Sequence, residues 1–259
     1  MILHELRLFF IALQFFTRLP VPRWVGYEPE WLHQSARHFP AVGAVVGGVG
    51  SAVLWAGLWL FPLPVAVGLS MAATVLLTGA FHEDGLADTC DGLGGAVSRE
   101  RALEIMKDSR IGSYGAVGLL LVLGLKAAAL TSMNAPMVFA ALVFAHTASR
   151  AAAVSLIRWL PYAGDVAHAK AKPLAQRVSA AGFAVAWGWV LVMGLVLVAW
   201  RPAWWPMVLL GLVTALVGAV GCALWLRRRL GGTTGDTLGA TQQLSELLVL
   251  LGYLAWLRA

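Results

Sequence analysis

Charged residues are scarce in this chain. Of its 259 residues only 12% are Asp, Glu, Lys or Arg, whereas 59% are hydrophobic, and the mean hydropathy is +0.77. A soluble domain of ordinary composition carries about 25% charged residues. The shortage of charge therefore excludes a single soluble globular domain and predicts an all-α, polytopic membrane protein.

Cysteine is almost absent as well. The two cysteines, Cys90 and Cys222, both map near the predicted cytoplasmic side, where disulfides are rare, so we expect free thiols. Cys90 stands beside Asp91 and could serve as a soft metal ligand. A small buried thiol is the commoner role for such a residue.

Long apolar runs, by contrast, are plentiful. A transmembrane helix needs about 20 mostly apolar residues. The chain offers seven candidate spans, at roughly 40–61, 63–81, 113–132, 136–157, 180–200, 204–226 and 238–257. They predict one integral membrane domain over residues 1–259, with no separate soluble domain.

The basic residues favour one orientation in the membrane. With the N-terminus inside, the cytoplasmic segments are 1–39, 82–112, 158–179 and 227–237, and they hold fifteen of the nineteen Lys and Arg residues. This bias follows the positive-inside rule and predicts a cytoplasmic N-terminus. Because these bases would face anionic headgroups of the lipid bilayer, the pI near 9.8 calls for no nucleic-acid partner.

Two segments outside the spans are also predicted to be helical. Residues 2–17 carry apolar side chains at helical spacing, interrupted by charges, which predicts an amphipathic helix in the inner interface rather than a signal peptide. Residues 98–110 begin with a plausible N-cap, Ser98, and predict a short cytoplasmic helix on which Glu104 and Asp108 share a face. A solvated, salt-bridged surface helix would show the same pattern.

The densest group of charges follows an uncharged run that ends at Phe81. Residues 82–92 hold four of the thirteen acids, and a helix would present Asp84, Asp88 and Asp91 on one face. Like charges on one face repel, so we expect a cation among them, and a hard divalent ion such as Mg²⁺ suits oxygen ligands. A helix end decorated with acids for solubility is the alternative.

A second motif lies on the same predicted side of the membrane. Residues 231–239 form a glycine-rich loop before the last span, and backbone N–H groups in such loops suit phosphate oxygens. Gly232, Thr234 and Gly235 are candidate phosphate contacts. Asp236 is either the N-cap of the last span or a further ligand. Taken alone, the motif is equally typical of a flexible turn followed by a cap.

Three charged residues fall within predicted spans, where an ionisable group is costly and usually functional. Glu246 lies deep in the last span, or near the headgroups if that span begins late; both interpretations stay open. Lys126 is expected to pair with an acid such as Glu246 or with backbone carbonyls. Arg150 could snorkel to the interface, neutralise the acids or clamp a phosphate.

Taken together, these motifs resemble one enzyme family. Segments 81–92, 106–112 and 231–240, with residues 16–20 and the pair Ser149-Arg150, occur in the order found in the cobalamin synthase (adenosylcobinamide-GDP ribazoletransferase) family. The resemblance covers nearly the whole chain. It implies a multi-pass enzyme of the bacterial inner membrane, acting late in vitamin B12 assembly, with its active site facing the cytoplasm.

The resemblance also implies a reaction and a metal. The enzyme would join adenosylcobinamide-GDP to α-ribazole or its 5′-phosphate, giving adenosylcobalamin or its phosphate plus GMP, with Mg²⁺ as the metal. On that basis Asp84, Asp88 and Asp91 would hold the metal, and His82 or Asp108 would serve as catalytic groups. The remaining candidates would contact substrate: Lys107, Arg110, Arg150, Gly232, Thr234, Gly235, Asp236 and Glu246.

Other functions stay open. Asp88-x-x-Asp91-Gly92 resembles the start of the CDP-alcohol phosphotransferase signature, although the continuation departs from it, so a lipid acceptor is one alternative. A transporter of divalent metal or corrinoid is another, but the acids cluster at one face rather than at the midplane. The sequence leaves open whether the chain forms a homo-oligomer or docks other enzymes of the pathway.

Overall fold

The computed structural model describes residues 2–95, 98–164 and 175–257. Lys170 and Lys172, which belong to the predicted cytoplasmic segment 158–179, and Arg258 lie outside these ranges. Within them the chain is all-α, apart from an isolated bridge between Tyr162 and Thr233. The α-helices are α1 (Ile2–Phe16), α2 (Pro29–Ser35), α3 (Phe39–Leu58), α4 (Leu63–Thr78), α5 (Phe81–Gly94), α6 (Arg99–Ile105), α7 (Ser113–Thr131), α8 (Ala135–Trp159), α9 (Ala180–Trp200), α10 (Trp205–Arg229) and α11 (Gly235–Trp256).

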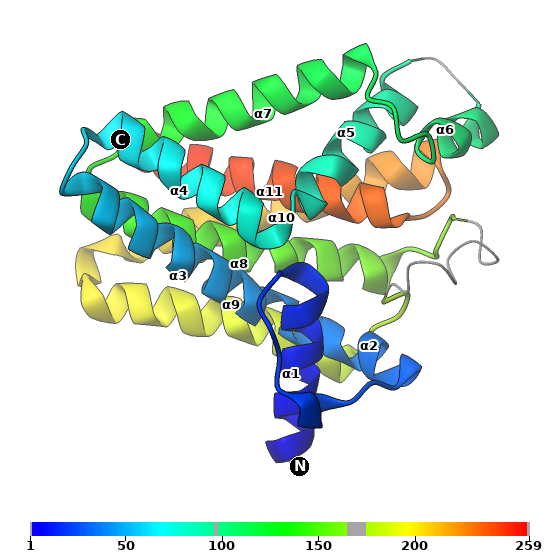
Figure 1. Ribbon diagram of the computed structural model, residues 1–259, viewed down its shortest axis with the longest axis horizontal. Coiled ribbons are helices and arrows are strands. Elements are labelled where there is room, and N and C mark those ends of the chain that lie inside the picture. The colour runs from blue at the N-terminus through cyan, green and yellow to red at the C-terminus, as the bar shows by residue number, and fades with distance from the viewer. Residues whose placement is uncertain (1, 96–97, 165–174, 258–259) are drawn as a thin grey trace.

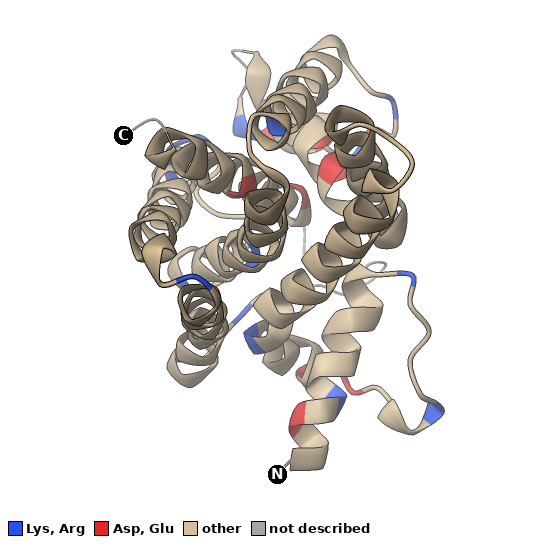
Figure 2. Cartoon of the chain, turned by 90° about the vertical axis from the view of Figure 1, so that its left-hand side faces the viewer, with Lys and Arg blue, Asp and Glu red and all other residues tan. Residues whose placement is uncertain are grey.

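The long helices run side by side and form a bundle with two ends (Figure 1). One end carries the turns between α3 and α4, α7 and α8, and α9 and α10. The other carries α5, α6 and the loop that leads into α11. Viewed from the first end, the helices show few charged residues (Figure 2).

Helix α8 is the central element. Of the 18 residues in its most apolar stretch, 89% are buried within the protein. Helix α3 packs directly on its backbone at two glycines: a Cβ at Gly43 would lie 2.1 Å from the carbonyl oxygen of His146, and one at Gly47 would lie 2.7 Å from that of Leu142. Small residues four apart allow such close helix contact in membrane proteins.

The number of spans can be compared with the prediction. Within the described residues, five helical segments are long and apolar enough to cross a membrane, or six if the bent pair α4–α5 counts as one span. Helix α11 has 22 residues but is not among them, because it carries several polar side chains. The polytopic all-α membrane fold is therefore confirmed, whereas the figure of seven spans stays a prediction.

The second predicted span is broken. Helix α4 ends at Thr78, and α5 leaves it at an angle of 88°. Gly79 and Ala80 make the corner with left-handed backbone angles, φ 67° and 58°, which glycine adopts easily and alanine rarely. The corner therefore swings the acid-rich segment out of line with the span.

Helix α1 runs across the long helices near the end that carries α5 (Figure 1). The chain after it is fixed to the corner, because Arg18 N–H donates to the carbonyl oxygen of Leu77 at 2.9 Å and its guanidinium lies against Gly79. This attachment holds Phe15 and Phe16 against Phe81 at the start of α5, at ring-centroid distances of 5.3 and 5.7 Å.

Candidate active site

Helix α5 presents three carboxylates on one face, as predicted. It is continuous from Phe81 to Gly94, so Asp84, Asp88 and Asp91 project to the same side; we call this the acid face. Asp84 is exposed, and Asp88 and Asp91 are half-buried.

Another side of α5 packs against the protein through glycine. A Cβ at Gly85 would lie 2.7 Å from the carbonyl oxygen of Asp236, and one at Gly92 would lie 2.8 Å from Met106. These close contacts bring both the 231–239 loop and the segment after α6 beside the acid face. The two motifs that the sequence placed on one side of the membrane are therefore neighbours in space.

Asp91 has a structural role that the sequence did not reveal. Its Oδ2 accepts a hydrogen bond from Gly112 N–H at 2.7 Å, and its Oδ1 accepts one from Gly115 N–H at 2.8 Å. These amides belong to the start of α7, where free N–H groups and the helix dipole favour a negative charge. Any Cβ at either glycine would come within 2.4 Å of a carboxylate oxygen, so both positions require glycine.

His82 lies on the side of α5 opposite the acid face. It is buried and stacks on Phe16, with ring centroids 5.3 Å apart and planes 13° apart. Its Nε2 has no hydrogen-bond partner among the described residues. The predicted catalytic histidine therefore faces the bundle interior and is not grouped with the three aspartates.

A polar network lies inside the bundle around Glu246. Lys126 Nζ is 2.8 Å from Glu246 Oε1 and donates to Gln243 Oε1 at 2.6 Å. On the other carboxylate oxygen, His146 Nδ1 lies at 3.2 Å and Gln242 Nε2 at 2.6 Å. The predicted pairing of Lys126 with Glu246 is confirmed. Glu246 is only 5% exposed, so its carboxylate is buried among these partners.

Arg150 and Glu83 extend this arrangement towards α5. Arg150 is 2% exposed and its Nη1 donates to the carbonyl oxygen of His146 at 3.0 Å, so the snorkelling interpretation was wrong. Gln243 Nε2 donates to Glu83 Oε1 at 2.9 Å. We call Glu83, Lys126, His146, Gln242, Gln243 and Glu246 the inner network. Sequence reasoning assigned no role to Glu83, Gln242 or Gln243, although two adjacent glutamines in a predicted span were an available signal.

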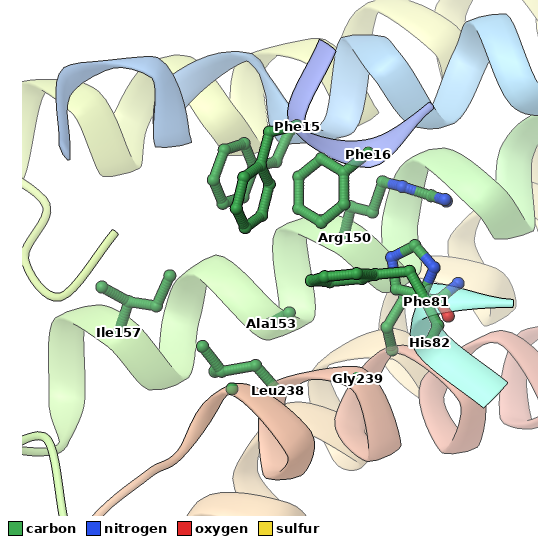
Figure 3. Close-up of a pocket in the computed structure, with 12 residues that line it drawn as sticks. Phe15, Phe16, Phe81, His82, Arg150, Ala153, Ile157, Leu238 and Gly239 are labelled. Carbon is green, nitrogen blue, oxygen red and sulfur yellow. The ribbon is translucent and has the colours of Figure 1, made fainter. Parts of the chain in front are cut away.

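Two cavities adjoin the inner network. The first, which we call the aromatic pocket, is lined by rings from α1, α3 and α5 (Figure 3). The second has mostly polar walls, including Thr78 and Glu83. His82, Arg150 and Gln242 line both cavities, so the two spaces share a wall.

The glycine-rich loop is a fixed turn. Thr233 N–H donates to the carbonyl oxygen of Pro161 at 2.9 Å, and a Cβ at Gly232 would lie 2.3 Å from the same oxygen. The N-cap of α11 is Thr234, whose hydroxyl accepts from Thr237 N–H at 3.2 Å, so assigning that cap to Asp236 was wrong. Gly232 and Thr234 are buried in this turn.

In the same loop, Gly235 and Asp236 are half-buried and lie at its surface. Of the four loop candidates, these two are therefore the ones a substrate could reach without rearrangement.

Helix α6 is shorter than predicted. Ser98 is its N-cap, accepting from Arg101 N–H at 3.3 Å, but the helix ends at Ile105 rather than Arg110. The expectation that Glu104 and Asp108 share a helical face was therefore wrong. Asp108 instead accepts several hydrogen bonds from Arg110, the shortest 2.6 Å from Nη2.

The same pairing sets the ionisation of Asp108. Hydrogen bonds from the side chain and backbone of Arg110 hold the pKa of the Asp108 carboxyl at about 2, below its ordinary 3.8. A carboxylate with so low a pKa is a weak base. Lys107 and Arg110 are exposed beside it and could contact phosphate.

Other basic residues brace the same end of the bundle. Arg99 Nε donates to the carbonyl oxygen of Leu230 at 2.7 Å, and Arg229 Nη2 donates to that of Gly95 at 3.1 Å. These bonds cross-link the chain after α5 to the chain before α11. They hold the glycine-rich loop in place beside the acid face.

The donor atoms of the acid face determine which metal ion it could bind. Among the described residues, no three His, Cys, Asp or Glu side chains converge into a metal site. Asp91 already accepts two amide hydrogen bonds, and Cys90 packs on α7, where a Cβ at Gly118 would lie 2.5 Å from its Sγ. Asp84 and Asp88 offer carboxylate oxygens only, a donor type that fits Mg²⁺ when phosphates and water complete the shell.

Known proteins are similar to this chain over nearly its full length. The sequence profile of the cobalamin-5-phosphate synthase family matches residues 8–254. The adenosylcobinamide-GDP ribazoletransferase of Leptothrix cholodnii is 62% identical over 266 residues, covering 98% of this chain and 97% of the relative. Proteins of the same name from Shewanella amazonensis and Vibrio cholerae are 47% and 42% identical, covering 95% and 98% of this chain and 94% and 96% of the relatives. No solved structure matches the chain.

Proposed function

The chain belongs to the cobalamin-5-phosphate synthase family, and we propose that it joins adenosylcobinamide-GDP to α-ribazole or its 5′-phosphate. It is a multi-pass membrane transferase of cobalamin biosynthesis. The observation that carries the proposal is the acid face of α5, which stands beside the exposed cations Lys107 and Arg110 and the surface of the 231–239 loop.

The reaction is a displacement at a diphosphate. A ribose hydroxyl of the acceptor attacks the phosphorus that stays with cobinamide, a new P–O bond forms, and the bond to the GMP phosphate breaks. The hydroxyl proton passes to a base, and GMP leaves as the anion. Catalysis of such a transfer depends mainly on positioning and on neutralising phosphate charge.

Each part of the site has a role in this proposal. Asp84 and Asp88 would hold Mg²⁺, which would supply positive charge against the diphosphate. Asp91 positions α5 against α7. Lys107 and Arg110 bind phosphate oxygens, and Gly235 and Asp236 border the substrate.

The proton acceptor is the least constrained role. The low pKa of Asp108 argues against that residue as the proton acceptor, and the interior position of His82 argues against the imidazole. Asp108 then serves to orient Arg110.

The orientation in the membrane is also part of the proposal. The end that carries α5, α6 and the 231–239 loop holds the predicted cytoplasmic basic segments, so we place it on the cytoplasmic side of the inner membrane. A corrinoid and a nucleotide would then reach the acid face from water. Cross-linking in native membranes would show whether the chain associates with itself or docks other enzymes of the pathway.

The direct test supplies labelled donor to the full chain in lipid nanodiscs with three acceptors: α-ribazole, a diacylglycerol, or none. We expect Mg²⁺-dependent GMP release and a corrinoid product with α-ribazole alone. GMP release with the lipid would instead support the CDP-alcohol type of transferase. Uptake of corrinoid into sealed vesicles without any product would support a transporter.

A further inference from the structure

The aromatic pocket lies where α1, α3, α5, α8 and α11 meet. The walls are mainly apolar and aromatic, as in sites that bind planar ligands.

The pocket is polar at one end only. Ile157, Ala153 and Leu238 lie at one end, and His82 and Arg150 lie at the other (Figure 3). The rings of Phe15, Phe16 and Phe81 stand between the two ends. This division favours a ligand that has an aliphatic edge and a polar edge.

The polar end has hydrogen-bonding groups to spare. His82 Nε2 and Arg150 Nε are both buried without a partner among the described residues. The two side chains are 3% and 2% exposed. Since buried polar groups are nearly always hydrogen-bonded, these two nitrogens indicate a ligand that brings an acceptor atom to this end.

We propose that the aromatic pocket binds the base of the acceptor, the 5,6-dimethylbenzimidazole ring of α-ribazole. This assignment rests on the proposed function. The two methyl groups lie at the Ile157 end, and the unsubstituted ring nitrogen accepts a hydrogen bond at the His82 end. The rings of Phe15, Phe16 and Phe81 contact the faces and edges of the bicycle.

The position of the pocket connects it to the acid face. Phe81 lines the pocket at the start of α5, and Asp84 follows it by three residues on the same helix, both being exposed. Gly235 also lines the pocket, next to Asp236, whose backbone touches Gly85. A ribose attached to the base therefore lies beside the helix that carries the carboxylates.

The proposal is tested with a variant whose larger side chain narrows the aliphatic end of the pocket. Ala153→Leu should lower kcat/KM for α-ribazole by about 10- to 200-fold, the range that one or two misplaced methyl groups give in an apolar site. For the riboside of unmethylated benzimidazole the loss should be at least several-fold smaller. The KM for adenosylcobinamide-GDP should stay unchanged.

A second pair of variants keeps the proposal testable if Ala153→Leu does not fold. Phe15→Leu should raise the KM for α-ribazole several-fold with little change in kcat. Phe10→Leu is its matched control, because Phe10 is also a half-buried ring of α1 but packs on Trp24, 5.7 Å away, outside the pocket. We expect Phe10→Leu to keep the wild-type KM.

Three outcomes separate the hypotheses. If Phe15→Leu matches Phe10→Leu and Ala153→Leu shows no selectivity between the two ribosides, the pocket does not hold the base. If native mass spectrometry finds a lipid that Ala153→Leu displaces without changing the KM for α-ribazole, the pocket is a lipid site. If wild type releases no GMP at all, the proposed function fails, and binding of radiolabelled α-ribazole without donor then tests the pocket by itself.

Discussion

Glu83 and Asp84 are adjacent in the sequence, yet their carboxylates lie in different surroundings. Glu83 turns into the bundle and joins the inner network, where Gln243 donates to it. Asp84 turns outwards and is exposed on the acid face. One helix thus contributes both to a buried polar network and to a negatively charged surface.

The difference teaches which charges stabilise the fold and which are available for chemistry. Glu246 of the inner network has Lys126, His146 and Gln242 within hydrogen-bond distance, as low dielectric surroundings require. The acid face lies at the surface of the protein, where Asp84 is exposed and Asp88 and Asp91 are half-buried. Substitutions in the inner network should therefore lower stability, whereas substitutions on the acid face should lower activity.

The largest expected effect is on the inner network. Lys126→Met leaves Glu246 buried without its cation and should lower the free energy of unfolding by about 3–5 kcal/mol. The double variant with Glu246→Gln should be more stable than Lys126→Met alone. Reversible unfolding in mixed detergent micelles measures both. Arg177→Met removes one partner of the exposed Arg177–Glu30 pair and should cost about 0–1 kcal/mol as a control.

The next effect separates chemistry from stability on the acid face. Asp88→Asn should lower the rate of Mg²⁺-dependent GMP release by roughly 100- to 1,000-fold, the scale of losing one charge-stabilising contact in a transition state. Its unfolding should resemble that of wild type, and Glu28→Gln, an exposed acid far along the chain, should keep full activity. Near-normal turnover by Asp88→Asn would remove the metal role from α5.

A third effect divides the acid face itself. Asp91→Ala removes the carboxylate that accepts from Gly112 and Gly115 at the start of α7, and should lower the free energy of unfolding by about 1–2 kcal/mol. Asp91→Asn should cost less because it keeps an acceptor oxygen. If Asp91→Asn raised the Mg²⁺ concentration needed for half-maximal activity while leaving stability intact, Asp91 would be a metal ligand rather than a cap.

The smallest effect concerns the pair Asp108–Arg110 beside the acid face. Because the folded pKa of Asp108 lies at about 2, below its ordinary 3.8, the stabilisation by this pair is complete above pH 4 and is lost only as the pH falls through about 2. The pair should therefore add no pH dependence to the free energy of unfolding between pH 5 and 9. Arg110→Ala should return the pKa of Asp108 towards 3.8, measured by carbon NMR of the labelled carboxyl. An unchanged value would show that another group lowers it.

Much of the fold could be predicted because apolar runs and their boundaries are local features. The fifth predicted span, 180–200, coincides with α9, and Asn134 and Pro136 mark the start of α8 near the predicted position. The corner at Gly79–Ala80 was missed because it lies inside an uncharged run, where neither periodicity nor charge marks a break. The early end of α6 was missed because the bonds of Asp108 to Arg110 compete with the helix there.

The site was predictable to the extent that it depends on spacing along one helix. That reasoning placed Asp84, Asp88 and Asp91 on one face and paired Lys126 with an intramembrane acid. It could not show that Asp91 meets the start of α7, that Glu83 meets Gln243, or that rings of α1 enclose a cavity with Phe81. Each of these depends on contacts between helices distant in the sequence, which no local pattern encodes.

The corner after α4 also determines how deep the site lies. Helix α4 has 16 residues and is therefore about 24 Å long, shorter than the roughly 30 Å hydrocarbon core of a bilayer. If the other end of α4 lies at the far surface of the bilayer, α4 ends below the near headgroups and α5 continues from that level. Thinner bilayers would bring this level closer to water, so turnover should rise as the acyl chains of the surrounding lipid shorten.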